Sequence, residues 1–112
     1  PVYADAIADE LAYVLDNAEV IFAAVQDQEQ VDKLLSVQER VPKLRHICYD
    51  EERGLKDYDH TRLHPLDAVI ASGKAALGEK AAADALDAEI AAGKCSGVSI
   101  NLYASGTTGR SK

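Results

Sequence analysis

The spacing of apolar residues predicts that the chain begins with a helix followed by a buried strand. Over residues 5–17 the apolar residues recur at the three- and four-residue intervals of one helix face: Ile7, Leu11, Val14, Leu15 and Ala18. The run "VIFAAV" at 20–25 is apolar throughout. Such a run is typical of a strand that is covered on both faces, as in a parallel sheet.

A second helix and a second strand are predicted directly afterwards. Asp27, with Gln30 three positions on, resembles a capping box at the start of a helix. The stripe of that helix consists of Val31, Leu34, Leu35 and Val41, and Pro42 ends it. "LRHICY" at 44–49 is the next strand candidate. Strand, helix and strand joined by short connections predict a βαβ unit, and therefore an α/β fold with parallel strands and flanking helices.

The segment that follows the second predicted strand shows no clear spacing of apolar residues. Residues 50–64, "DEERGLKDYDHTRLH", are polar and unpatterned, so we expect a surface excursion there. Pro65 can start a short helix. That helix passes through Leu66, Val69 and Ile70, and we expect Gly73 and Gly78 to interrupt it.

An Ala-rich helix and a third strand are predicted in the last third of the chain. The helix covers about residues 79–92, with Gly93 as its C-cap. "VSINLY" at 98–103 alternates apolar and polar residues, which is the period of a strand. No repeat, linker or shift of composition marks a boundary, so residues 1–112 are interpreted as belonging to one domain.

The charge distribution limits the partners of the chain. The net charge of −7 over 112 residues argues against a nucleic-acid or anionic-membrane binder, because phosphate backbones need clustered Lys and Arg. After Glu89 the chain has no acidic residue, and only Lys94, Arg110 and Lys112 carry charge. The end of the chain is therefore locally basic and suited to a small anion.

Cysteine content and hydropathy predict the compartment. Cys48 and Cys95 make no disulfide framework, so we expect two free thiols in a reducing cytosol. The sequence shows neither a membrane-spanning run nor a signal segment, which predicts a soluble, cytoplasmic protein. The chain starts at Pro1 and contains no Met, so we expect it to be a piece of a longer protein.

The spacing of two histidines raises the question of a metal site. His60 and His64 are four residues apart, a spacing that shares a metal on a helix, but their segment runs into Pro65 without a helical stripe. A solvated loop is the preferred interpretation, and no metal site is predicted. His46 lies in a predicted strand and is interpreted as an ordinary sheet residue.

The terminal segment "SGTTGRSK" has the chemistry of an anion-binding loop. Its glycines allow backbone N–H groups to approach a ligand, and its hydroxyls add small donors. Counting from Gly106 places Ser111 where a P-loop needs its second Gly, and no G-x-G-x-x-G occurs. An ordinary polar hairpin or tail is the alternative on composition.

"YASGTTGRSK" at 103–112 resembles the signature loop of the adenylate-forming (AMP-binding) enzymes, which usually read Tyr-Thr-Ser-Gly-Thr-Thr-Gly-x-Pro-Lys. Seven of ten positions match. The departures are Ala104, which removes a hydroxyl, and Ser111 in place of Pro. Residues 1–55 also resemble the corresponding part of bacterial long-chain fatty-acid–CoA ligases, with helix "ADELAYVLDNAE", then "DQEQVDKLL" and "LRHI". The resemblance covers essentially the whole chain and is weakest at 75–97.

The resemblance implies an N-terminal part of the large ATP-binding domain, which ends inside the signature at 103–112. Such enzymes activate a carboxylate with Mg-ATP and transfer the acyl group to coenzyme A, so ATP, Mg²⁺ and coenzyme A are the implied co-substrates. The implied phosphate-binding residues are Ser105, Gly106, Thr107, Thr108, Gly109 and Lys112. Tyr103 would help to seat the loop, and no catalytic residue is implied.

By the same resemblance, the acid-binding pocket, the Mg²⁺-binding acid and the catalytic lysine follow this loop. We therefore expect residues 1–112 to be inactive when separated from that remainder. Two alternatives stay open at this point: a non-catalytic α/β module that binds a nucleotide or a partner, and a CoA ligase for another carboxylic acid.

Overall fold

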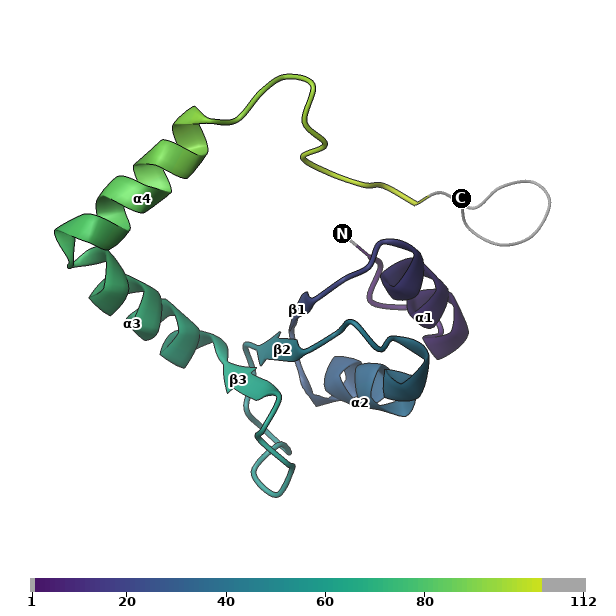
Figure 1. The fold of residues 1–112 in the computed structure, drawn as a ribbon. Helices are drawn as coiled ribbons and strands as arrows, with labels where there is room; N and C mark the ends of the chain where they lie inside the picture. Colours follow the sequence, from purple (N-terminus) through teal and green to yellow (C-terminus); the bar gives the residue numbers. More distant parts are fainter. Residues whose placement is uncertain (1, 104–112) are drawn as a thin grey trace.

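The computed structural model describes residues 2–103 and shows an α/β arrangement (Figure 1). The described residues form a three-stranded parallel sheet in the order β1-β2-β3. In chain order the elements are α1 (Ala8–Asn17), β1 (Phe22–Val25), α2 (Gln28–Ser36), the 3₁₀ turn η1 (Gln38–Arg40), β2 (His46–Tyr49), β3 (Leu63–Pro65), α3 (Leu66–Leu77) and α4 (Lys80–Ala91). The α/β class and the parallel strands predicted from the sequence are confirmed.

The predicted βαβ unit consists of β1, α2 and β2. The two strands pair in parallel, with Phe22 opposite His46 at one end and Val25 opposite Tyr49 at the other. The Asp27 carboxylate accepts a hydrogen bond from the backbone N–H of Gln30 at 3.2 Å, so the predicted N-cap is confirmed. In a full capping box the Gln30 side chain would bond back to the backbone N–H of Asp27. Here the Gln30 side-chain amide instead donates a hydrogen bond to the carbonyl of Ala4.

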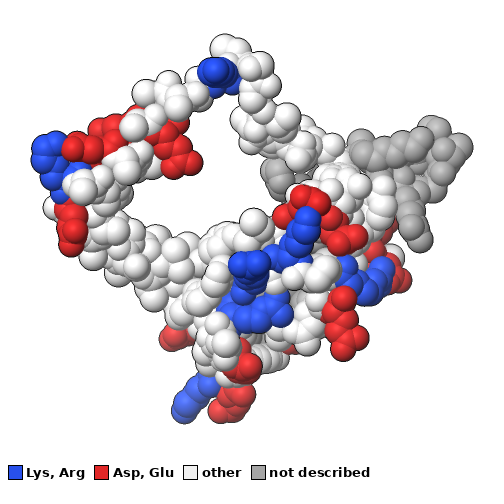
Figure 2. All heavy atoms as spheres, in the orientation of Figure 1, with Lys and Arg blue, Asp and Glu red and all other residues white. Residues whose placement is uncertain are grey.

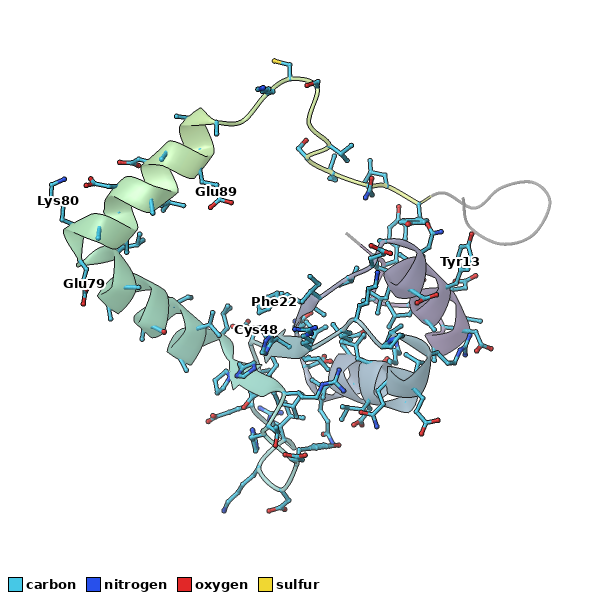
Figure 3. All side chains as sticks on the ribbon, in the orientation of Figure 1. Tyr13, Phe22, Cys48, Glu79, Lys80 and Glu89 are labelled. Atoms are coloured by element: carbon cyan, nitrogen blue, oxygen red, sulfur yellow. The ribbon has the colours of Figure 1, made fainter. Side chains whose placement is uncertain are left out.

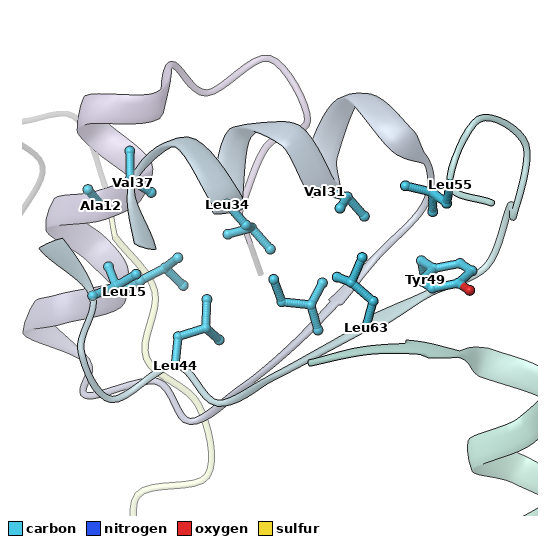
Figure 4. Close-up of a cluster of buried hydrophobic side chains, with 11 residues drawn as sticks. Ala12, Leu15, Val31, Leu34, Val37, Leu44, Tyr49, Leu55 and Leu63 are labelled. Atoms are coloured by element: carbon cyan, nitrogen blue, oxygen red, sulfur yellow. The ribbon is translucent and has the colours of Figure 1, made fainter. Parts of the chain in front are cut away.

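The core lies between α1, α2 and one face of the sheet (Figure 4). Its buried cluster consists of Ala12, Leu15, Val31, Leu34, Val37, Val41, Leu44, Ile47, Tyr49, Leu55 and Leu63. Ile47 and Tyr49 point to this face because successive strand residues alternate. The cluster is otherwise aliphatic, since Tyr49 is its one aromatic member.

The interpretation of residues 50–64 as a surface excursion is wrong at two places. Leu55 and Leu63 are 1% and 2% exposed and belong to the core. Leu63 also opens β3, whose pairing with β2 includes the 2.8 Å bond from the Ile47 N–H to the Arg62 carbonyl. A strand of three residues is too short to show a period, so only tertiary pairing defines it.

The expected interruption at Gly73 is also wrong, because α3 continues through it to Leu77. An added Cβ at Gly73 would meet nothing within 4 Å. The glycine therefore weakens the helix by about 1 kcal/mol relative to Ala without breaking it. The helix ends at Gly78, whose N–H donates to the carbonyls of Lys74 and Ala75. The predicted Ala-rich helix is confirmed as α4, and the N–H of Gly93 bonds to Ile90.

Residues 98–103 are described, and they form no strand, so that prediction is wrong. The three alternating apolar side chains Val98, Ile100 and Leu102 are 81%, 58% and 70% exposed. Alternation gives a segment two faces, but a strand also needs a neighbour that accepts and donates its backbone hydrogen bonds. Within the described residues the three-stranded sheet does not extend to this segment.

The second half of the chain curves away from the sheet and returns toward α1 (Figure 1). Neither described helix of this half, α3 or α4, contains a buried residue. Figure 2 shows the opening that this path encloses. The radius of gyration is 16.4 Å, against about 13 Å expected for a compact chain of this length. Residues 2–103 therefore combine a packed α/β part with an open helical extension.

No helix in the described part of the chain is both long and apolar enough to span a bilayer.

Candidate functional site

The six residues predicted to bind phosphate lie outside the described residues. They are Ser105, Gly106, Thr107, Thr108, Gly109 and Lys112, all within the segment 104–112. Of the signature "YASGTTGRSK", the structure describes Tyr103. The phosphate-binding roles of the other residues stay predictions.

Tyr103 brings the start of the signature beside the end of α1. Its hydroxyl donates a hydrogen bond to the Asn17 Oδ1 at 2.7 Å, across 86 positions of sequence. Asn17 is the last residue of α1. The role of Tyr103 in seating the loop stays a prediction, because the loop itself lies outside the described residues.

The carboxyl ends of the strands are acidic. Ligands of open parallel sheets usually bind outside these ends. Here β1 is followed by Asp27, and β2 is followed by Asp50, Glu51 and Glu52. The Asp27 carboxylate already accepts a hydrogen bond from the backbone N–H of Gln30 in the first turn of α2. These carboxylates make this edge less favourable for a triphosphate, although Arg53 directly follows them.

A shallow groove of about 360 Å³ lies on the face of the sheet that α1 and α2 leave open, next to α3. Its lining consists of Phe22, His46, His64, Pro65, Ala68, Val69 and Ser72. Figure 3 shows Phe22 and Cys48 on the neighbouring strands β1 and β2. Most of the lining is apolar, and its titratable members are the two histidines.

Strand register brings these two histidines together. Cys48 pairs with His64, and His46 lies two residues before Cys48 on the same face of β2. The His46 Nδ1 and the His64 Nε2 are 3.1 Å apart, with ring centroids 5.2 Å apart and an interplanar angle of 47°. His46 is exposed and His64 is half-buried.

Sequence spacing had suggested a different pair. His60 and His64 are separated in the structure, because His60 Nε2 bonds to the carbonyl of Leu55 at 3.0 Å while His64 belongs to β3. The interpretation of His64 as part of a solvated loop is therefore wrong. The pairing of His46 with His64 depends on the register of β3, and no sequence signal revealed that strand.

Cys48 faces the same side of the sheet but is a poor nucleophile. It is 1% exposed, and this burial, with a smaller effect from Asp50, raises the pKa of its thiol. A thiol with a raised pKa stays protonated at neutral pH and reacts slowly. Cys48 and Cys95 are both free, as expected, and Cys95 is exposed.

Two carboxyl groups with lowered pKa values have structural partners. A hydrogen bond from Lys43, at 2.5 Å, lowers the pKa of Glu19, the non-glycine residue with a positive φ among those described. Hydrogen bonds from the hydroxyl and the backbone of Thr61 lower the pKa of Asp59. Both carboxylates fix turns. Among residues 2–103, moreover, no three His, Cys, Asp or Glu side chains gather as a metal site.

Comparisons with known proteins return no match for this chain, whether with protein-family models, curated proteins or solved structures.

Proposed function

We propose that this chain is part of an ATP-dependent acid–thiol ligase of the adenylate-forming class. The observation that carries the proposal is the signature "YASGTTGRSK" at 103–112, in which seven of ten positions match the usual form. A run of this length with fixed glycines, hydroxyls and a terminal lysine is specific. The upstream resemblance favours a long-chain fatty acid as the carboxylate.

The fold supports the proposal at the level of class. Nucleotide-binding α/β domains are built from parallel strands joined by helices, and residues 2–103 contain such a sheet with a βαβ unit. The acidic carboxyl ends of the strands favour a phosphate site in the later, basic part of the chain. The signature lies in that part, which contains Lys94, Arg110 and Lys112 after the last acidic residue.

The proposed chemistry has two balanced steps. A carboxylate oxygen attacks the α-phosphorus of ATP, forms the acyl-adenylate and expels pyrophosphate. The thiolate sulfur of coenzyme A then attacks the acyl carbon and expels AMP, and the thiol proton passes to solvent. The first step depends on neutralising charge on the phosphates.

The signature residues would supply this neutralisation without covalent chemistry. The segment Ser105–Gly109 would wrap the β- and γ-phosphates through backbone N–H groups and hydroxyls. Lys112 would add a point charge where pyrophosphate leaves. Ala104 offers one hydroxyl fewer than the usual Thr or Ser, so we propose a phosphate contact missing from this loop.

The first experiment is to measure the mass of the native polypeptide with an antibody raised against residues 27–60. A band several times larger than 12.0 kDa is expected, because the proposal places the remaining machinery after the signature. A band at 12.0 kDa would favour a non-catalytic nucleotide-binding module instead.

The second experiment is ATP–pyrophosphate exchange with that native polypeptide, using long-chain, branched and aromatic acids. Exchange that depends on a carboxylic acid is expected, and a long-chain acid should give the highest kcat/KM. Lys112→Met should lower exchange by about 10²-fold, the usual effect of removing one group that stabilises developing charge. Lys94→Met is the matched control, because it removes an equal charge outside the signature. Absence of exchange with every acid would overturn the proposal.

A further inference from the structure

We propose that His46 and His64 form a two-imidazole site for a divalent transition-metal ion such as Zn²⁺. The site lies on the open face of the sheet, at the groove between β1, β2 and α3. It uses none of the signature residues, so it is independent of the ligase proposal.

The separation of the two nitrogens fits a shared metal ion. Two imidazole nitrogens that each lie about 2.0–2.1 Å from a metal, at bond angles between a right angle and the tetrahedral angle, are about 2.9–3.4 Å apart. The His46 Nδ1 and the His64 Nε2 are 3.1 Å apart. The two rings already face each other, so little rearrangement of side chains is needed.

The strands hold the two rings in place. His46 starts β2, and His64 is the middle residue of β3, which pairs with β2 in parallel. Neither ligand therefore depends on a loop for its position. His46 is exposed at the groove, so an ion can enter from solvent and keep water molecules as its remaining ligands.

The donor set selects the type of ion. Imidazole suits Zn²⁺, Ni²⁺ and Cu²⁺, whereas Mg²⁺ and Ca²⁺ require oxygen ligands. No third His, Cys, Asp or Glu joins the pair among the described residues, and Cys48 is buried as a thiol on the same face. Two protein ligands give an exchangeable site, which can be loaded and stripped without unfolding the chain.

Metal binding replaces the hydrogen bond between the rings. In the metal-free pair, one of the two facing nitrogens carries the bridging proton. For both nitrogens to ligate, that ring must move its proton to its other nitrogen, so both imidazoles remain neutral and no proton is lost.

The test is isothermal titration of the native protein with Zn²⁺, Ni²⁺ and Mg²⁺, using wild type and three single variants. Zn²⁺ and Ni²⁺ should bind at a site that requires both histidines, whereas any binding of Mg²⁺ should be the same in wild type and in all three variants. His46→Gln and His64→Gln should each weaken Zn²⁺ binding by about tenfold or more. His60→Gln is the matched control and should leave binding unchanged, because His60 bonds to the backbone at Leu55.

A second measurement does not depend on variants that fold. Substoichiometric Cu²⁺ should broaden the imidazole resonances of His46 and His64 in NMR spectra of the wild type and leave those of His60 sharp. Equal broadening of all three histidines, or titrations in which His60→Gln weakens binding as much as His46→Gln, would overturn the proposal. So would a wild type that binds neither Zn²⁺ nor Ni²⁺.

Discussion

The phenol hydroxyl of Tyr58 donates a hydrogen bond to the Asp32 carboxylate at 2.7 Å and accepts one from the Gln28 amide at 2.9 Å. Asp32 and Gln28 both belong to α2, whereas Tyr58 belongs to the segment between β2 and β3. This segment, polar in sequence, is therefore attached to the helix at the same end of the molecule where Leu55 enters the core.

Tyr58→Phe should lower the free energy of unfolding by about 1 kcal/mol, because the ring stays and both hydrogen bonds are lost. Urea denaturation monitored by circular dichroism measures the change. Tyr3→Phe is the matched control, since Tyr3 is 85% exposed. An equal effect in both variants would show that the Tyr58 hydroxyl adds no stability.

Leu55→Ala should destabilise the chain by about 2–5 kcal/mol, the usual range for truncating a fully buried leucine. Leu55 is 1% exposed, although its neighbours in sequence are polar. The same substitution at Leu77 of α3, which is 46% exposed, should change stability by about 0.5 kcal/mol or less. Comparable losses at the two positions in thermal melts would contradict the assignment of Leu55 to the core.

Asp27→Ala should cost about 1 kcal/mol, because it removes the N-cap of α2 and leaves the Gln30 N–H without its side-chain acceptor. Asp27→Asn should be nearly neutral, since asparagine keeps the capping oxygen and removes only the charge. Chemical denaturation of the pair separates capping from electrostatics. If Asp27→Asn were as destabilising as Asp27→Ala, charge rather than capping would be the cause.

Stability should fall as the pH rises from 7 to 10, partly because of Cys48. Burial raises the pKa of this thiol in the folded chain, so the unfolded chain releases the thiol proton first, above about pH 8.5. The stability that the protonated Cys48 thiol contributes is fully present below its pKa in the unfolded chain. It is lost as the pH rises toward its pKa in the folded chain. Burial also raises the pKa of Tyr49, which adds a loss at higher pH.

Urea denaturation at pH 7 and pH 10 should therefore show a smaller loss of stability for Cys48→Ala than for wild type. Cys95→Ala is the control, because this thiol is exposed in the folded chain and its removal should leave the loss unchanged. The comparison uses the difference between the two pH values, so any cavity left at position 48 cancels. An identical loss in Cys48→Ala and wild type would refute the role of Cys48.

Sequence patterns predicted the elements that are long or that have strong end signals. The helix expected over 5–17 is α1, the strands expected at 20–25 and 44–49 are β1 and β2, and the Asp27 cap is present. Leu15, Val31 and Leu34 set the helical period and also pack in the core, so local pattern and tertiary packing agree for the two helices. The expectation that the strand at 20–25 is buried on both faces is wrong, because Phe22 lies on the face that α1 and α2 leave open and is 48% exposed.

Other features depend on pairing between distant segments. β3 has three residues and follows a polar run, so its pairing with β2 is what reveals it. The segment 98–103 has the period of a strand but no partner strand among the described residues. The proximity of His46 and His64 follows from register across β2 and β3, which spacing along the chain does not encode.

The two faces of β2 also determine how this short strand aligns with β1. With four residues in each strand, few backbone hydrogen bonds separate the observed alignment from its neighbours. A shift by one position would turn every side chain of β2 to the opposite face. Ile47 and Tyr49 would then leave the buried cluster, and the imidazole of His46 would enter this aliphatic core. The burial of Ile47 and Tyr49 on one face of β2 therefore favours the observed alignment over the neighbouring ones.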